Sequence, residues 1–241
     1  MTFVKRRPDA PPGFFAVEAA GLRWLAEART VPVPEVLAVD ERSITLARVP
    51  AGRSTAVGAE RFGRGLADLH ATGAAAFGAP WPGFIGPLPM DNTPSPAWPA
   101  FYAERRVLPF LRAAVDAGSV DAAGAARIER ALDRLSSLPG ADEPPARLHG
   151  DLWSGNLLWD AEGTGWIVDP AAHGGHRETD LAMLSLFGLP HLERVVAAYD
   201  EQRPLATGWR ERVGLHQLHP LLVHAVLFGG AYGTRAAAVA G

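Results

Sequence analysis

The stretch Leu148–Asn156, LHGDLWSGN, lies between a proline-rich run and an apolar, strand-like run, and it decides the fold. It places His149, Asp151 and Asn156 within eight residues, on a segment that two glycines allow to turn sharply. Asp and Asn beside glycines are often turn residues whose side chains bond the local backbone. The spacing H-x-D-x-x-x-x-N is more demanding than a turn requires, so we treat the stretch as a candidate loop for chemistry.

Two apolar runs follow this stretch, Leu157–Asp160 and Trp166–Asp169, with a short polar turn between them. Such a pair is typical of a β-hairpin. With residue numbers across the ladder summing to about 325, Asn156 falls opposite Asp169, and directly opposed residues have Cβ atoms about 4.5–5.5 Å apart. An amide oxygen and a carboxylate would then converge, and hard oxygen ligands of this kind suit Mg²⁺. Asp151, held beside the cation, could accept a proton from a substrate hydroxyl.

The spacing matches the phosphotransferase pattern, in which a base Asp and a metal-binding Asn precede a second metal-binding Asp. That pattern also needs a lysine on a strand of the first lobe and a glutamate on the next helix. The strand Thr2–Lys5 supplies the lysine, and the expected helix Phe14–Ala28 carries Glu18 on its apolar stripe. Glu18 could be a partly exposed helix acid. Because a buried carboxylate without a partner is costly, we favour an ion pair between Lys5 and Glu18.

Composition limits the classes of partner. The 241 residues suit one large domain or two small lobes, and a hydrophobic content of 48% excludes a disordered chain. The formal net charge of -3, without clusters of Lys and Arg beyond local pairs, argues against a nucleic-acid partner. No apolar run is long enough to cross a bilayer, so we expect no membrane partner. The chain has no cysteine, which excludes disulfides and thiolate metal sites and fits a reducing, cytoplasmic location.

The order of the expected elements is typical of an α+β protein. Residues 1–49 are predicted to form a small lobe of the lysine strand, the helix and two further strands, 35–39 and 43–49, that end in a hinge. Residues 50–241 are predicted to form a mostly helical lobe around the hairpin, with a kink or break near Pro220. Its expected helices are 59–72, 98–117, 119–138, 178–187, 189–201 and 209–231. The segment 79–99 holds seven prolines and is expected to be an irregular loop.

HGDLWSGN, together with IVDPAAHGGHRETDLAMLSLFG at Ile167–Gly188, resembles the fructosamine kinase (ketosamine-3-kinase) family, within the aminoglycoside phosphotransferase and choline kinase-like group. The larger group shares only H-x-D-x-x-x-x-N and a later Asp. Trp153–Gly155 and Gly175–Glu178 are more specific to the fructosamine kinases. Further similar stretches bring the resemblance to nearly the whole chain, namely Val4–Lys5, Gly83–Pro87, Glu104–Arg106 and Leu227–Gly230.

The resemblance implies a protein-kinase-like fold of two lobes, here with a truncated N-terminal β lobe. It also implies transfer of the γ-phosphoryl group of ATP, with Mg²⁺, to a sugar hydroxyl of a small or protein-bound ketosamine. The acceptor would be the 3-hydroxyl of a fructosamine or ribulosamine, and the phosphorylated adduct would then break down and free the amine.

The same resemblance assigns roles to single residues. Asp151 matches the catalytic base, and Asn156 and Asp169 match the metal ligands. Lys5 matches the lysine that binds the phosphates, with Glu18 as its partner. Ala47, Arg48 and Val49 match the hinge whose backbone contacts adenine. Asp180 matches a carboxylate that holds the catalytic loop.

Several other side chains are candidates for binding. Trp153, His173 and His176 are possible substrate contacts, and Trp153 could either stack on the sugar or its amine carrier or pack as a lid. The histidines with Asp151 could also be taken for a zinc site, but their spacing is unlike motifs such as H-E-x-x-H. His149 is expected to pack and hydrogen-bond beneath the loop.

One departure from the family concerns the start of the chain. Family members normally have two strands and a glycine-rich loop before the lysine strand, whereas Lys5 is the fifth residue here. Either the start lies upstream, or the chain lacks the loop. The lysine strand is then expected to be a sheet edge with unpaired backbone groups, so a homodimer through this edge is a hypothesis.

Three functions remain open from the sequence. The first is a ketosamine kinase, and the second is a kinase of the same fold that acts on an aminoglycoside- or choline-like acceptor. The third is a non-catalytic nucleotide-binding protein without the glycine-rich loop. Retention of the residues from Lys5 to Asp169 argues against the third, and the run Gly175–Glu178 favours the first over the second.

Overall fold

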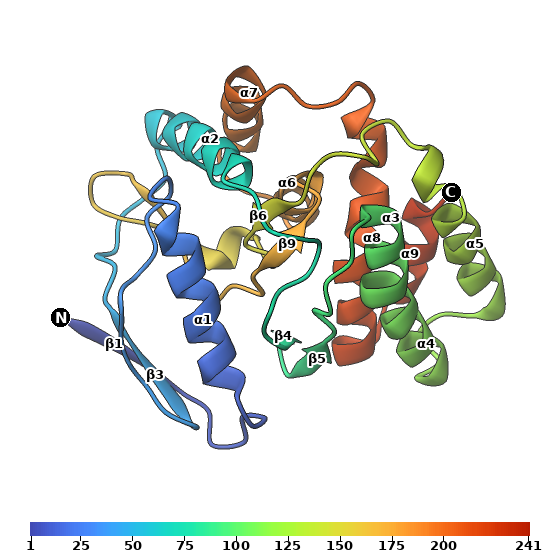
Figure 1. The fold of residues 1–241 in the computed structure, drawn as a ribbon, viewed down its shortest axis with the longest axis horizontal. Coiled ribbons are helices and arrows are strands. Elements are labelled where there is room, and N and C mark those ends of the chain that lie inside the picture. The colour runs from blue at the N-terminus through green and yellow to red at the C-terminus, as the bar shows by residue number, and fades with distance from the viewer.

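The computed structural model describes all 241 residues, and it places a small sheet with one covering helix beside a larger, mostly helical region (Figure 1). The sheet contains β1 (Thr2–Arg6), β2 (Val36–Val39) and β3 (Ser43–Ala47), and it is covered by α1 (Phe14–Glu27). The strand order is β1-β3-β2, with both pairs antiparallel. Side chains alternate across β3, so its two buried residues face α1. Together with α1 they form a core of five residues, Phe15, Ala19, Leu22, Ile44 and Leu46.

The register of β1 decides where the lysine points. Lys5 pairs with Ile44, and opposed residues of a ladder lie on the same face of the sheet. Because Ile44 is buried against α1, Lys5 also faces α1. β1 is an edge of this sheet, as the sequence predicted.

Helices form most of the rest of the chain. In order they are α2 (Ala56–Ala71), α3 (Trp98–Phe101), α4 (Leu108–Asp116), α5 (Ala122–Leu132), α6 (Glu178–Leu186), α7 (Leu192–Gln202), α8 (Trp209–Phe228) and α9 (Tyr232–Val239). A core of 24 buried residues joins α3, α4 and α5 to α8 and α9. A second core of 16 buried residues lies where α2 packs against α7, with α6 below them in Figure 1, and it includes Leu157 and Ile167. None of the helices combines the length and apolarity that a bilayer crossing requires.

Two short antiparallel pairs lie between these helices. β6 (Ala146–Leu148) pairs with β9 (His173–Gly175), and the predicted hairpin is β7 (Leu157–Trp159) with β8 (Gly165–Ile167). Leu157 pairs with Ile167, so the predicted register was wrong by one residue, and Asn156 lies opposite Val168. The ladder ends there because Asp169 takes a left-handed conformation, with φ of 53°.

Other sequence predictions need correction as well. Residues 79–99 are not wholly irregular, since they contain the hairpin of β4 (Gly83–Ile85) and β5 (Leu88–Met90). The helix predicted over 98–117 contains a π-helical segment, Tyr102–Val107, between α3 and α4, and the one predicted over 119–138 is shorter. α8 does not break at Pro220, whose neighbours are buried in the largest core. It ends at Phe228, where two glycines with positive φ lead into α9.

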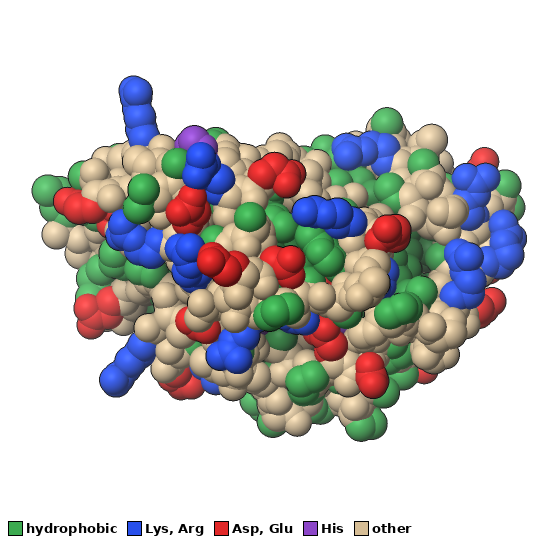
Figure 2. Space-filling view, turned by 90° about the horizontal axis from the view of Figure 1, so that it is seen from above, with side chains coloured by type: hydrophobic (Ala, Val, Ile, Leu, Met, Phe, Trp, Pro, Cys, Tyr) green, Lys and Arg blue, Asp and Glu red, His purple; other side chains and the backbone are tan.

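The surface carries both signs of charge close together. In the view from above, acidic and basic side chains are interspersed across the face (Figure 2).

Candidate active site

A cavity of about 260 Å³ opens between α1, the β4–β5 hairpin and the loop that follows β6. Five residues predicted to act together line it, although they come from three separate parts of the chain. They are Lys5, Glu18, Asp151, Asn156 and Asp169. Trp153, Phe14 and Phe84 also line the cavity, so charged groups share it with aromatic rings.

The ammonium of Lys5 lies between two carboxylates. Its Nζ is 2.9 Å from Glu18 Oε2 and 3.0 Å from Asp169 Oδ1. Burial disfavours the cation, but the two carboxylates more than offset this and raise the pKa of Lys5, so the lysine is charged. Glu18 is only 5% exposed, and burial, opposed by Lys5 and reinforced by Asp169, raises the pKa of its carboxyl group. The ion pair expected between β1 and α1 is therefore present.

The loop that carries Asp151 is held by the carboxylate of Asp180, at the start of α6. Asp180 accepts hydrogen bonds from the backbone N–H groups of His149, at 2.8 Å, and Gly150, at 2.9 Å. Gly150 has φ of 83°, and a Cβ atom there would collide with the carbonyl oxygen of Ala171. The loop therefore needs glycine at this position.

His149 packs beneath the loop, as the sequence predicted. Its Nδ1 accepts a hydrogen bond from the N–H of Asp151 at 3.2 Å, and its Nε2 donates to the carbonyl oxygen of Val168 at 2.8 Å. Burial lowers the pKa of His149. Because both ring nitrogens are used, His149 has no lone pair left for a metal ion.

Two residues that the sequence did not single out extend this support. His70 Nε2 lies 3.2 Å from Asp180 Oδ2, and Tyr199 Oη lies 2.8 Å from His70 Nδ1. Burial opposes ionisation of Asp180, but the hydrogen bonds from His70 and the loop outweigh it and lower the pKa of Asp180. Burial raises the pKa of Tyr199, so its hydroxyl stays protonated and donates a hydrogen bond to His70. A buried chain of hydrogen bonds thus runs from α7 through α2 and α6 to the loop.

The surroundings of Asp151 disfavour the ionised form of its carboxyl group. Burial raises the pKa of Asp151 to about 7, a hydrogen bond from Asn156 opposes the shift, and the negative charges of Asp169 and Asp180 add to it. A base whose pKa lies near the working pH is well suited to accept a proton in catalysis.

Asn156 and Asp169 offer oxygen atoms to the same space. The side-chain nitrogen of Asn156 donates to the backbone oxygen of Asp151 at 2.8 Å, to its carboxylate at 3.2 Å and to the backbone oxygen of Asp169 at 3.4 Å. Its Oδ1 is therefore the atom left to bind a ligand. The left-handed backbone of Asp169 is uncommon for a residue with a side chain and is typical of functional positions. Two hard oxygen donors at the lining of one cavity fit Mg²⁺.

The predicted adenine segment lies outside the lining of the cavity. Ala47 N–H donates to the carbonyl oxygen of Glu35 at 2.9 Å, and Arg48 N–H donates to that of Met1 at 3.2 Å. Among the backbone N–H groups of Ala47, Arg48 and Val49, only that of Val49 has no partner within the chain. The role of this segment in binding adenine stays a prediction.

The prediction that His173 and His176 contact the substrate was wrong. They are 4% and 1% exposed and do not line the cavity. His173 Nδ1 bonds the carbonyl oxygen of Ala171 at 2.8 Å, and His176 Nε2 bonds that of Gly140 at 3.0 Å. Trp153 does reach the cavity and is 38% exposed.

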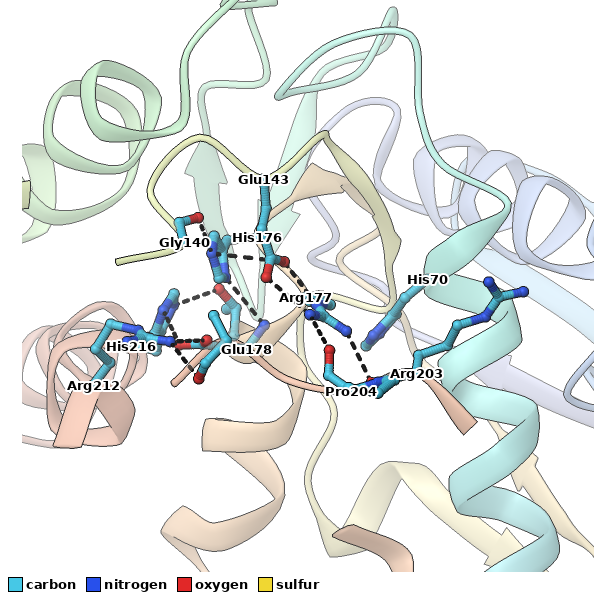
Figure 3. Close-up of polar contacts among 12 residues, drawn as sticks. His70, Gly140, Glu143, His176, Arg177, Glu178, Arg203, Pro204, Arg212 and His216 are labelled. Atoms are coloured by element: carbon cyan, nitrogen blue, oxygen red, sulfur yellow. Dashed lines mark hydrogen bonds and ion pairs between the residues drawn. The ribbon is translucent and has the colours of Figure 1, made fainter. Parts of the chain in front are cut away.

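The run Gly175–Glu178 builds a structural clamp instead. Figure 3 shows Glu178 directed at Arg212 and His216 of α8, and Arg177 directed at Glu143. Arg212 donates to both oxygens of Glu178, at 2.9 and 2.6 Å. Burial opposes ionisation, but the nearby ring of His216, whose Nε2 lies 3.4 Å from Glu178 Oε2, and the hydrogen bonds from Arg212 outweigh it and lower the pKa of Glu178 to about 2. The clamp ties the start of α6 to α8.

Ligand atoms of His176, Glu178 and His216 lie within 4.8 Å of one another, a spacing that a metal ion could bridge. However, Arg212 already occupies both oxygens of Glu178. His176 bonds Gly140 through one ring nitrogen and accepts from the N–H of Glu178 at 3.3 Å through the other. The cluster is therefore an ion-pair network.

Comparisons with known proteins agree with this geometry. The model of the family described as fructosamine kinase matches residues 1–240. A probable ketoamine kinase of Thermus thermophilus is 38% identical over 233 aligned positions, and the alignment covers 95% of this chain and 82% of the relative. The chloroplastic protein-ribulosamine 3-kinase of Arabidopsis thaliana is 33% identical over 245 aligned positions, and the alignment covers 98% of this chain and 74% of that protein.

Solved structures give the same result. A Thermobifida fusca protein assigned provisionally as a fructosamine-3-kinase superposes with a TM-score of 0.95 at 54% identity, covering 99% of this chain and 84% of that one. A choline/ethanolamine kinase family protein of Mesorhizobium loti shares the fold, with a TM-score of 0.63 at 19% identity and coverage of 99% and 82%. The fold is thus the α+β, protein-kinase-like fold that the motifs predicted, with a small N-terminal sheet and a helical C-terminal part. The chain is a phosphotransferase and belongs to the fructosamine kinase family.

Proposed function

We propose that the protein transfers the γ-phosphoryl group of ATP to a sugar hydroxyl of a ketosamine, the 3-hydroxyl of a fructosamine or ribulosamine. The observation that supports this most directly is the convergence of one ammonium, one raised-pKa carboxyl group and two oxygen ligands on a single cavity. Phosphoryl transfer depends mainly on positioning and on stabilising charge, and these groups supply both.

In the proposed reaction, Asp151 takes the proton of the acceptor hydroxyl while its oxygen attacks the γ-phosphorus. The new oxygen–phosphorus bond forms as the bond from the γ-phosphorus to the bridging oxygen breaks, and ADP leaves with the bonding electrons. Lys5 offsets the charge of the phosphates, and Glu18, 2.9 Å away, orients its ammonium. The proton held by Asp151 then passes to solvent.

Asn156 Oδ1 and Asp169 would hold Mg²⁺, which when bound neutralises charge on the phosphate oxygens. Lys5 and Asp169 already lie 3.0 Å apart, so the cation, the ammonium and the phosphates would share one small region. We thus propose Asp151 as the base, Asn156 and Asp169 as the metal ligands, and Lys5 as the group that binds the phosphates.

The acceptor class rests on the family and on its relatives. The ribulosamine kinase of Arabidopsis thaliana and the ketoamine kinases cover nearly this whole chain, which supports a ketosamine over an aminoglycoside or a choline-like acceptor. The raised pKa of Asp151 and the paired Lys5 support catalysis over simple nucleotide binding.

The acceptor can be tested by measuring ADP release with a ribulosamine, a fructosamine, an aminoglycoside and choline, each at saturating Mg-ATP. We expect turnover with the two ketosamines, and NMR of the product should place the phosphate on the 3-hydroxyl. Turnover with only the aminoglycoside or choline would replace the proposed acceptor. ATP binding without turnover of any acceptor would support a non-catalytic protein.

The base can be tested with Asp151→Asn, which keeps the size of the side chain and removes its ability to accept the proton. A positioned base typically contributes about 10²–10⁴-fold, so we expect kcat to fall at least about a hundredfold while the affinity for ADP changes little. Isothermal titration with Mg-ADP provides the second measurement. Full turnover by this variant would remove Asp151 from the role of base.

A further inference from the structure

Arg106 places a positive charge in the interior of the helical region. It belongs to the π-helical segment Tyr102–Val107 and is only 2% exposed. Its Nη1 donates to the carbonyl oxygens of Asp91, at 2.6 Å, and Arg105, at 3.2 Å. Its Nη2 donates to Asn92 Oδ1 at 2.6 Å. These oxygens belong to backbone or side-chain amides, so none of them carries a negative charge.

The buried charge of Arg106 has no counter-ion beside it. The carboxylate of Asp91 favours the cation, but it is 43% exposed and bonds Arg105 at 2.7 Å. Burial outweighs it and lowers the pKa of Arg106 to about 9, so the side chain is still a cation at neutral pH. The other buried arginine, Arg212, has Glu178 as its counter-ion at 2.6 Å. A buried charge without such a partner is costly.

A small cavity of about 10 Å³ adjoins the guanidinium of Arg106. It lies where the π-helical segment meets α8 and the β6–β9 pair, and its lining includes Phe101, His173 and His219. We call it the Arg106 cavity. A volume of this size holds one particle about as large as a water molecule. It therefore excludes phosphate, sulfate and organic carboxylates, and it admits a water molecule or a monatomic ion.

Two buried nitrogen atoms of this lining have no hydrogen-bond partner, namely Arg106 Nε and His219 Nε2. The Nε–H group of arginine can only donate a hydrogen bond. Burial and the charge of Arg106 lower the pKa of His219 well below its ordinary value, so its ring is neutral and can carry its proton on Nε2. Buried donors without a partner are rare in native proteins, and a bound water or ion is a common explanation.

The histidine on the other side of the cavity adds no charge. His173 Nδ1 donates to the carbonyl oxygen of Ala171 at 2.8 Å, and burial together with Arg106 lowers the pKa of His173 to about 3. The charge of the Arg106 cavity is therefore that of the guanidinium alone, which is positive.

We propose that the Arg106 cavity binds one chloride ion, held by Arg106 Nε and His219 Nε2. A monatomic anion matches the volume, accepts hydrogen bonds from both unused nitrogen atoms and supplies the missing negative charge. A water molecule would accept the same hydrogen bonds, but it would leave the charge of Arg106 uncompensated.

The ion would act on the active site through the β4–β5 hairpin. Arg106 bonds the chain directly after β5, at Asp91 and Asn92, and the hairpin contributes Phe84 to the lining of the active-site cavity. Because the anion lowers the cost of burying Arg106, it stabilises the folded protein and the attachment of this hairpin.

The first test is thermal unfolding at constant ionic strength. Replacing about 100 mM gluconate by chloride should raise Tm by about 3–6 °C, the shift expected when the free ion is at about ten times its dissociation constant. Equal Tm values in the two salts would overturn the inference. The measurement needs no turnover, so its outcome is separate from that of the proposed function.

Two variants assign the effect to one side chain. Arg106→Met removes the buried charge, so its Tm should be the same in chloride and gluconate. Arg105→Met is the matched control, because Arg105 is the neighbouring residue, is 36% exposed and has its own carboxylate in Asp91. This control should keep the chloride-dependent shift. A shift that Arg106→Met retains in full would overturn the site.

Crystals of the unaltered protein grown in bromide provide a measurement that needs no variant to fold. Bromide replaces chloride and scatters anomalously at its absorption edge. We expect an anomalous peak in the Arg106 cavity, within hydrogen-bond distance of Arg106 Nε and His219 Nε2. Ordinary density without an anomalous signal would identify a water molecule and overturn the proposal. Anomalous peaks only at the protein surface would show adventitious ions only, with the same consequence.

Discussion

At the scale of single residues, Asp151 is the group whose environment most affects both chemistry and stability. Burial and the nearby charges of Asp169 and Asp180 raise its pKa, although Asn156 donates a hydrogen bond that opposes the shift. The folded chain therefore carries an ionised Asp151 at alkaline pH only at a cost. An ionised Asp151 therefore lowers the stability of the folded protein as long as no cation or substrate is bound.

This cost gives a prediction for pH dependence. The pKa of Asp151 is about 7 in the folded chain, against an ordinary value of 3.8. Between these values the folded state binds more protons than the unfolded state, so stability falls as pH rises from about 4 to about 7. Asp151→Asn removes this loss. Its Tm relative to the unaltered protein should therefore increase more at pH 8 than at pH 5, without nucleotide or Mg²⁺.

Calorimetric melting at the two pH values makes the comparison. Asp160→Asn is a control, because hydrogen bonds from Trp166 and from the backbone lower the pKa of Asp160, so its loss should destabilise. An Asp151→Asn advantage that is equal at both pH values would show that the pKa is not raised.

Site residues were predictable from the sequence where one charged group needs another group close to it. Glu18 was found because a carboxylate on an apolar stripe needs a cation, and the structure places Lys5 beside it. Asn156 and Asp169 were found from the hairpin, although the register was one residue in error. His173 and His176, expected as possible substrate contacts, lie in the interior instead, where they bond the carbonyl oxygens of Ala171 and Gly140. Nothing in the local sequence shows which way these two side chains point.

At the scale of elements, α2, α6 and α7 meet in the hydrogen-bond chain from Tyr199 through His70 to Asp180. The hydroxyl of Tyr199 makes His70 Nδ1 an acceptor, which leaves Nε2 protonated and directed at Asp180. Without the hydroxyl, the other tautomer could form and would place a lone pair against the carboxylate. The tyrosine therefore selects the tautomer that supports the loop of Asp151.

We expect Tyr199→Phe to lower kcat about tenfold with KM for ATP within about twofold, because the loop is less firmly held. Hydrogen exchange at the amides of His149 and Gly150 should become faster. Tyr102→Phe is the matched control, since Tyr102 is equally buried and donates to the carbonyl oxygen of Leu215 at 2.7 Å. If both variants lose the same activity, the effect is one of general packing.

The long helices were predictable from their apolar periodicity, whereas four of the six three-residue strands were not. β4, β5, β6 and β9 are too short for an alternating pattern to be recognised. β7 and β8 are equally short, but their two apolar runs on either side of a polar turn indicated a hairpin. The prolines around β4 and β5 also favoured a loop. Their pairing depends on tertiary contacts, such as those of the β4–β5 hairpin with α1, which a local pattern does not contain.

At the scale of the whole molecule, three cores of different size hold the protein together. The helical regions have cores of 24 and 16 buried residues, whereas the sheet with α1 has one of five. Lys5 joins this smallest core to the cavity through Asp169. The sheet is therefore the part whose hydrogen exchange should be fastest among the regular elements.

The exposed edge of this sheet predicts association. Among residues 1–241, β1 pairs only with β3, and Val4 is 44% exposed. Unpaired strand edges favour pairing with another chain, and a lysine on the edge discourages it. We expect sedimentation velocity to show a concentration-dependent dimer that Val4→Lys weakens and that Val115→Lys, on the exposed side of α4, leaves unchanged. A monomer at every concentration would contradict this prediction.

The clamp formed by Arg177, Glu178 and Arg212 has a practical meaning for comparing relatives. The run Gly175–Glu178, one of the two stretches most specific to this family, holds α6 to its neighbours and does not line the cavity. Two relatives that agree in this run can thus differ in the molecule that they bind. A change meant to alter the acceptor should therefore leave the clamp intact.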